Sequence, residues 1–134
     1  MGTIRRRIST TASAAQVWDT IRDVGALHTR LVPGFVIATR LEEEGRVRVV
    51  TFGNGAVVRE PIVSCEDASM RLVWTASGGL TAHYNASVQV TADEGGGCSV
   101  TWVADFLPDS AEPALTGAIE AGIGIMKKTL DKLG

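Results

Sequence analysis

The chain has 134 residues, of which 45% are hydrophobic and 21% are charged, a size and composition typical of one globular domain, here predicted to span residues 1–134. Its formal net charge of −2 argues against a domain dedicated to nucleic acid. No apolar run reaches the roughly 18 residues of a transmembrane span, and no apolar segment follows the arginines at positions 5–7 as a signal peptide would require. The cytoplasm is therefore the expected location.

The N-terminal part is predicted to contain one strand and two short helices. Residues 3–9 form the strand. Ser13 and Gln16 have the spacing of a capping box, in which the serine side chain accepts from the backbone three residues on and the glutamine side chain bonds back. The helix that follows carries Trp18 on its apolar face, and residues 26–31 form the second helix.

From position 35 onward, apolar and polar residues alternate with the period of a strand. The segments between the alternating stretches are short and rich in Gly, Asn, Asp and Ser, so they are turns rather than crossovers. The pattern predicts an antiparallel meander of six strands at residues 35–42, 46–52, 56–63, 70–76, 82–92 and 98–107.

A long helix is predicted from Asp109 or Ser110, either of which is a suitable N-cap, to about Leu133. Its buried face should contain Leu115, Ile119, Gly122, Ile123, Met126, Leu130 and Leu133. Gly117, Gly122 and Gly124 each cost about 1 kcal/mol relative to alanine in a helix. They therefore indicate a need for space, either for closer contact between helix and sheet or for ligand volume.

This order of elements, β-αα-ββββββ-α, resembles the START-like superfamily, also called SRPBCC, and most closely its bacterial polyketide cyclase/dehydrase-like branch. The resemblance covers nearly the whole chain, and its motifs are residues 13–19 at the first helix, Pro33-Gly34, residues 55–60, and Trp102 followed by Phe106 and Pro108. It implies an α+β helix-grip (Bet v 1-like) fold, in which a seven-stranded antiparallel sheet wraps around the C-terminal helix and leaves an apolar cavity. Members of the superfamily bind lipids, sterols, hormones or aromatic polyketides, and a minority are enzymes.

The alternation within the strands agrees with such a cavity, because one sheet face is predicted to be apolar. On residues 82–92 and 98–107 the inward set includes Tyr84, Val88, Trp102 and Phe106. The predicted ligand-binding residues are Phe35, Phe52, Val58, Glu60, Trp74, Tyr84, Trp102, Phe106, Ile119, Gly122, Ile123 and Met126.

Glu60 is the most informative polar residue in this set. If its strand face points inward, the carboxylate lies in an apolar cavity, where desolvation raises its pKa. It could then anchor a ligand hydroxyl or act as a general base. The alternative is a salt bridge at the rim or on the surface with Arg48, Arg59 or Arg71.

No metal site or cofactor is expected, because the two histidines and two cysteines lack metal-ligand spacing. His83 is predicted to be solvated, and His28 to lie at the cavity mouth or on the surface. Cys65 and Cys98 are predicted to be free, half-buried thiols in a reducing compartment.

Three functions are considered: binding or transport of a small apolar molecule, lipid-like or aromatic; a polyketide cyclase/dehydratase-type enzyme using Glu60 or Tyr84 as acid–base; and a protein-interaction module. The cyclases of the superfamily carry two strand arginines and a helix asparagine, where this chain has Ser64, Ser77 and Gly122. Binding is therefore favoured and no catalytic residue is assigned. The expected partner is the small apolar ligand, without nucleic acid or a membrane span, and a homodimer is compatible with the sequence.

Ligand access is predicted to involve two glycine-rich turns at residues 53–55 and 77–80. Glycine permits the backbone changes that such a moving turn requires. Phe52 and Leu80 would flank the entrance, with His28 and Leu31 opposite them. The alternative is that both segments are plain hairpin turns.

Overall fold

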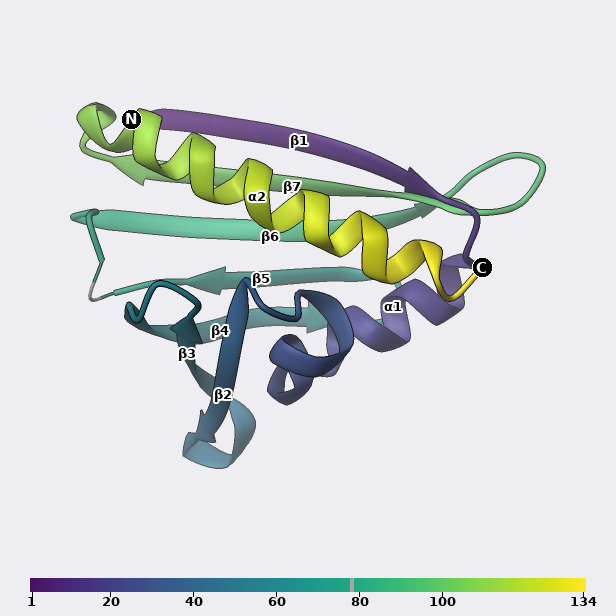
Figure 1. The fold of residues 1–134 in the computed structure, drawn as a ribbon, viewed down its shortest axis with the longest axis horizontal. Coiled ribbons are helices and arrows are strands. Elements are labelled where there is room, and N and C mark those ends of the chain that lie inside the picture. Colours follow the sequence, from purple (N-terminus) through teal and green to yellow (C-terminus); the bar gives the residue numbers. More distant parts are fainter. Residues whose placement is uncertain (78) are drawn as a thin grey trace.

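The computed structural model describes residues 1–77 and 79–134. It contains one antiparallel sheet with strand order β1-β7-β6-β5-β4-β3-β2, and the long helix α2 lies along one face of this sheet (Figure 1). The predicted helix-grip fold and its order of elements are confirmed. The strands are β1 (Gly2–Thr10), β2 (Val36–Glu42), β3 (Val47–Phe52), β4 (Val57–Glu66), β5 (Arg71–Thr75), β6 (His83–Ala92) and β7 (Cys98–Leu107). The helices are α1 (Ala14–Arg22), the short segments η1 (Val24–Ala26), η2 (Leu27–Leu31), η3 (Glu43–Gly45) and η4 (Asp109–Ala111), and α2 (Glu112–Asp131).

The predicted alternation of β6 and β7 is confirmed. From Ala86 to Val90 on β6 and from Val100 to Phe106 on β7, the inward side chains are buried and those between them are half-buried. The register places Ala86 opposite Ala104 and Val88 opposite Trp102, so one apolar stripe runs across both strands. A slip of one residue would have turned this stripe to solvent, and the register therefore fixes which side chains can reach the space beneath α2. The buried set is Ala86, Val88, Val90, Val100, Trp102, Ala104 and Phe106.

Helix α1 begins with the predicted capping box. The Ser13 side chain accepts from the Gln16 backbone N–H, and the Gln16 side chain accepts from the Ser13 backbone N–H. The apolar face of α1 is buried, and Trp18 is only 6% exposed. The Trp18 indole Nε1 donates to the Asp67 carboxylate at 2.8 Å, which ties α1 to the turn between β4 and β5.

Two strands contain a bulge that the alternation does not predict. One lies between Val36 and Ala38 of β2, and the other between Ile62 and Ser64 of β4. Val63 falls within the second bulge and is exposed. β4 continues to Glu66, three residues past the predicted end at 63, because Ser64, Cys65 and Glu66 still pair with β5.

The start of α2 differs from the prediction. Neither Asp109 nor Ser110 caps the helix, because both lie in the 3-10 turn η4. Ala111 occupies the N-cap position without a side-chain hydrogen bond, and Pro113 lies in the first turn as expected. Among the described residues, no helix is both long enough and apolar enough to cross a membrane.

Trp18 is predicted to stabilise the fold without contributing to the cavity. Trp18→Ala should lower the free energy of unfolding by about 3–5 kcal/mol, because a large buried aromatic side chain is lost. Trp18→Phe, which keeps an aromatic ring but removes the hydrogen bond to the exposed Asp67 and part of the buried ring, should cost less than Trp18→Ala. Urea unfolding followed by circular dichroism measures both. Equal stability of Trp18→Ala and the wild type would show that α1 does not depend on this side chain.

Candidate functional site

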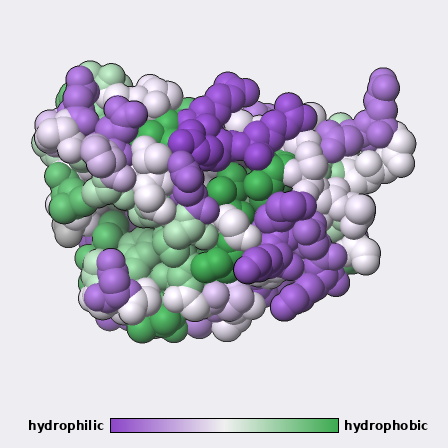
Figure 2. Space-filling view, turned by 45° about the horizontal axis from the view of Figure 1, so that its top comes forward, coloured by the Kyte–Doolittle hydropathy of each residue, from purple (hydrophilic) through white to green (hydrophobic). Residues whose placement is uncertain are grey.

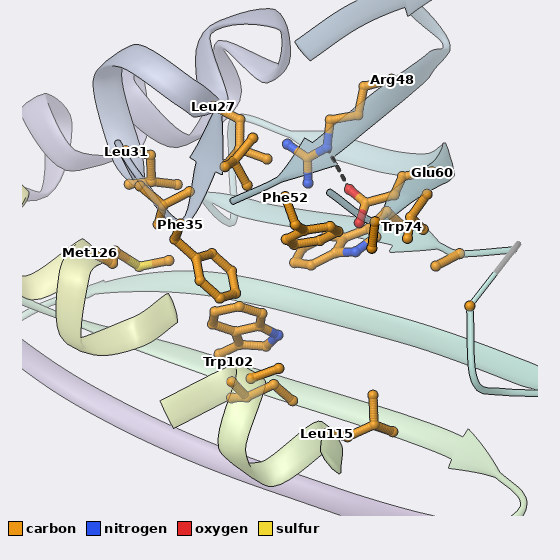
Figure 3. A pocket seen from close by; sticks show the side chains of 18 of the residues that line it. Leu27, Leu31, Phe35, Arg48, Phe52, Glu60, Trp74, Trp102, Leu115 and Met126 are labelled. Carbon is orange, nitrogen blue, oxygen red and sulfur yellow. Dashed lines mark hydrogen bonds and ion pairs between the residues drawn. The ribbon is translucent and has the colours of Figure 1, made fainter. Parts of the chain in front are cut away.

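A cavity of about 940 Å³ lies between the inner face of the sheet, the segment around η2 and helix α2. Figure 3 shows the cavity from close by, with η2 and β2 on one side and α2 on the other. In Figure 2, apolar surface gathers on the left half of the face shown, whereas hydrophilic residues dominate its upper edge and right side. The cavity is large enough to hold a small molecule.

The structure places nine of the twelve predicted site residues on the cavity wall. They are Phe35, Phe52, Val58, Glu60, Trp74, Tyr84, Trp102, Ile119 and Met126. Phe106, Gly122 and Ile123 were predicted to belong to the same lining, but they are buried and do not line the cavity. Phe106 lies against Gly2 of β1, where an added Cβ would come within 2.4 Å of its ring. Whether the nine wall residues bind a ligand stays a prediction.

The three glycines of α2 have different surroundings. A Cβ on Gly122 would lie 2.9 Å from the Phe35 ring and 3.3 Å from the Trp102 ring. A Cβ added to Gly117 or Gly124 would have nothing within 4 Å, and both glycines are exposed. Close approach therefore explains only Gly122, which lets two aromatic side chains of the wall touch the helix.

Aromatic side chains are concentrated on the cavity wall. Phe35 and Phe52 meet edge to face, with ring centroids 5.4 Å apart and an interplanar angle of 79°. Trp74 and Trp102 lie 6.2 Å apart and tilted by 57°. In Figure 3 these four rings converge on the centre of the cavity, Phe35 from the turn before β2 and the other three from β3, β5 and β7. They form a wall suited to flat or aliphatic apolar groups.

Glu60 points into the cavity wall and forms a buried salt bridge with Arg48. The Arg48 Nε donates to Glu60 Oε1 at 2.8 Å, and the two residues are 3% and 7% exposed (Figure 3). They are direct neighbours in the β3–β4 register. The predicted inward orientation of Glu60 and the alternative of a salt bridge with Arg48 are thus both realised, but inside the wall rather than at the rim.

Arg48 also lies over the Trp74 ring, with its guanidinium carbon 5.2 Å from the ring centroid. This cation–π contact and the salt bridge hold the guanidinium from two sides. Arg48 was missed as a site residue because β3 has apolar residues on both faces, so alternation does not indicate its direction. The hairpin around the 53–55 turn pairs Arg48 with Glu60, and this pairing could have indicated that both side chains point to the same face.

Burial controls the acid–base properties of the wall. It raises the pKa of the Glu60 carboxyl, while the charge and hydrogen bond of Arg48 oppose that rise. Burial also raises the pKa of the Tyr84 hydroxyl, and the nearby Glu60 charge adds to the effect. The nearby Trp102 indole opposes this rise in the pKa of Tyr84. Within residues 1–77 and 79–134, however, the indole Nε1 has no hydrogen-bond partner. Tyr84 is therefore a neutral donor at physiological pH.

The sequence reasoning missed the aliphatic side chains of the wall that come from the short helical segment, β5 and the start of α2. Their signal was weak, because Leu, Ile and Val on a helix face equally predict plain core. They include Leu27, Val32, Leu72, Leu115, Ala118 and Ile125.

Both glycine-rich turns contribute to the wall. Gly53 and Asn54 line the cavity from one turn, and Gly79 and Leu80 line it from the other, whereas Gly78 lies outside the described residues. Leu31 also lines the cavity, but His28 does not: its Nδ1 lies 3.0 Å from the Thr39 hydroxyl. The placement of His28 at the cavity mouth is therefore wrong.

The remaining titratable candidates lie away from the cavity. His83 is exposed and lies 2.7 Å from the Asn85 side chain. Cys65 is exposed and Cys98 is buried, and both are free thiols. In the part of the chain that the structure describes, no three His, Cys, Asp or Glu side chains are grouped to hold a metal ion.

The family model described as "Polyketide cyclase / dehydrase and lipid transport" matches residues 1–134. No curated protein matches the chain.

Solved structures share the fold at low sequence identity. The protein XoxI from Bacillus cereus aligns with a TM-score of 0.87 and 20% identity, over 97% of this chain and 96% of that one. A START superfamily protein from Mycobacterium smegmatis aligns with a TM-score of 0.76 and 12% identity, over 98% and 99%. Norcoclaurine synthase from Thalictrum flavum, in complex with dopamine and hydroxybenzaldehyde, gives 0.77 and 17%, over 98% and 85%. At these identities the similarity establishes the fold alone.

The helical glycines are predicted to respond differently to alanine. Gly117→Ala and Gly124→Ala should each stabilise the protein by about 0.5–1 kcal/mol, because the added methyl group meets open space and helix propensity improves. Gly122→Ala should lose most of this gain, because its methyl group displaces Phe35. Thermal unfolding of the three variants tests this, and an equal gain at all three positions would contradict the close contact at Gly122.

Breaking the buried salt bridge should destabilise the protein in a pH-dependent way. Arg48→Met leaves the Glu60 carboxyl buried without a partner, at a cost of about 3–5 kcal/mol near neutral pH. Because the pKa of Glu60 in the folded variant then lies well above the unfolded value of about 4.3, the variant is most stable below that value. It loses stability as the pH rises through the folded pKa.

The double variant Arg48→Met with Glu60→Gln is the control for this prediction, because it removes the titratable group. It should recover most of the lost stability and lose the pH dependence. Urea unfolding at several pH values measures both variants. A pH-independent loss in the single variant would mean that Glu60 is not buried as a charge.

Proposed function

The chain belongs to the polyketide cyclase/dehydrase and lipid transport family, and from this premise we propose that it binds a small apolar molecule, lipid-like or aromatic, in the cavity between the sheet and α2. The observation that carries the proposal is the cavity itself, about 940 Å³ and walled mainly by apolar side chains. Small-molecule sites typically measure about 300–1,000 Å³ and combine apolar walls with a few polar groups. The Arg48–Glu60 pair and Tyr84 are such groups.

The aromatic side chains support the proposal independently of the volume. Most of the few aromatic residues of the chain, Phe35, Phe52, Trp74, Tyr84 and Trp102, line the cavity. A plain core would instead distribute its aromatic rings so as to fill space. Rings gathered around a hollow leave part of their surface facing the cavity, and an apolar ligand would cover it.

Binding is preferred to catalysis for two reasons. One oxygen of Glu60 accepts a hydrogen bond from Arg48, a group that does not release a proton in proteins, so this carboxylate is a poor general base. The positions that correspond to the polar groups of the related cyclases do not line the cavity either: Ser64, Ser77 and Gly122 are all absent from its wall. The cytoplasmic location belongs to this proposal, and a homodimer stays a prediction.

Ligand binding is tested by filling the cavity. N-phenyl-1-naphthylamine, whose fluorescence rises in apolar surroundings, should bind the wild type. Val58→Trp places an indole into the cavity from β4 and should weaken binding by about tenfold or more, since 1.4 kcal/mol of lost contact corresponds to that factor. Val57→Trp is the matched control, because the neighbouring Val57 is 55% exposed on the other strand face. Its affinity should equal that of the wild type.

Two results would overturn the proposal. One is the absence of any fluorescence rise with the folded wild type. The other is an equal affinity of Val58→Trp and Val57→Trp for the probe, which would place the binding site outside the cavity.

A further inference from the structure

Four polar side chains of the cavity wall form one group, here called the polar cluster: Arg48, Glu60, Tyr84 and Trp102. Arg48 and Glu60 are paired by register and by their hydrogen bond. The chain just after β5 connects this pair to Tyr84. Ser77 forms a β-bridge with Arg59, the neighbour of Glu60, and the Ala76 backbone N–H donates to the Tyr84 backbone carbonyl. The Glu60 charge and the Trp102 indole both act on the Tyr84 hydroxyl. The four side chains therefore share one region of the wall.

The polar cluster has more hydrogen-bond donors than acceptors. The Trp102 indole, a donor only, is 9% exposed, and its Nε1 is a buried polar atom without a partner in the described chain. Arg48 uses Nε for Glu60, and its two Nη groups donate to none of the described residues. The Tyr84 hydroxyl both donates and accepts. The acceptors of the polar cluster are this hydroxyl oxygen and the second oxygen of Glu60, and they are fewer than its free N–H and O–H groups, so donors are left to be satisfied.

The charges of the polar cluster cancel. Arg48 and Glu60 carry one positive and one negative charge at 2.8 Å, while Tyr84 and Trp102 are neutral. A ligand carboxylate would leave an uncompensated negative charge in a largely apolar cavity, which is unfavourable. An uncharged oxygen could accept from Trp102 or Arg48 without that penalty.

We propose that the polar cluster binds the acceptor oxygen of an uncharged group, such as a ketone, ester or alcohol, on an otherwise apolar ligand, and that it selects against carboxylates. This inference rests on the proposed function and specifies the chemistry of its ligand. The other polar wall side chains described, Asn54 and Thr81, belong to the two turns, and the Asn54 oxygen already accepts from the Ala56 backbone. The ligand therefore has one polar end, and its apolar body lies against Phe35, Phe52 and α2.

Three naphthalene derivatives of similar shape test this proposal: 2-acetylnaphthalene, the 2-naphthoate anion and 2-ethylnaphthalene. Their affinities are measured at neutral pH by displacement of N-phenyl-1-naphthylamine. The ketone should bind at least about tenfold more tightly than the carboxylate, as an unpaired buried charge predicts. The hydrocarbon should also bind, because it needs only the apolar wall.

Substitutions then identify the donors. Trp102→Phe should lower the ratio of ketone affinity to hydrocarbon affinity about fivefold, the typical effect of one hydrogen bond, because the lost ring area affects both ligands alike. Tyr84→Phe is a second variant that removes a hydroxyl and keeps the ring, and it should act in the same direction. Trp18→Phe is the matched control, since Trp18 lies outside the cavity and its N–H already binds Asp67. It should change neither affinity.

The outcomes separate the two proposals. Binding of the hydrocarbon, together with equal affinities for ketone and carboxylate, would overturn the inference about the polar cluster and leave the proposed function intact. The same holds if neither Trp102→Phe nor Tyr84→Phe distinguishes ketone from hydrocarbon. Tight binding of the carboxylate with uptake of a proton would show that Glu60 gives up its charge, which also overturns it. Failure of all three compounds to bind the folded protein would overturn the proposed function, and this inference with it.

Discussion

One helix cannot cover a sheet of seven strands. At about 4.8 Å between neighbours the sheet is roughly 30 Å wide, whereas a helix with its side chains is about 10 Å across. Helix α2 lies over the β1, β7 and β6 side (Figure 1), and the inner face of β3, β4 and β5 needs another cover. The segment around η2 and the start of β2 supplies it. This segment touches α2 where Phe35 lies against Gly122, and the remaining space between the segment, α2 and the sheet is the cavity. The hollow therefore follows from the width of the sheet.

This geometry also explains where polar groups can be buried. Beneath α2, the β6 and β7 side chains are tightly packed, and small residues such as Ala86 and Ala104 face the helix. A salt bridge has no room there. On β3 and β4 the cover is more distant, so Arg48 and Glu60 can lie within the wall, each partly compensating the desolvation of the other. The Arg48–Glu60 pair is thus confined to the part of the sheet that α2 does not cover, whereas Tyr84 and Trp102 reach the cavity from β6 and β7.

The fold could be predicted from the sequence because its signals are local. The capping box at Ser13, the alternation around Trp102 and the turn residues each determine one element or one register. The site was only partly predictable, because its limits depend on which helix covers which strand. Phe106 has the same alternation as Trp102, yet it lies against Gly2 of β1 and is sealed from the cavity. Arg48 is the opposite case, a cavity residue that the alternation does not indicate. Apolar residues lie on both faces of β3, so the orientation of Arg48 follows only from its register with Glu60.

The position of β1 has a consequence for biosynthesis. β1 leaves the ribosome well before its partner β7, with which it pairs from Thr3 opposite Asp105 to Thr10 opposite Cys98. At about 5–20 residues per second, β1 waits at least several seconds for that partner. During this time its backbone groups are unpaired, and the edge of β7 does not yet exist. The arginines at positions 5–7 give the waiting strand a positive charge, and charge on an unpaired strand opposes its association with other nascent chains.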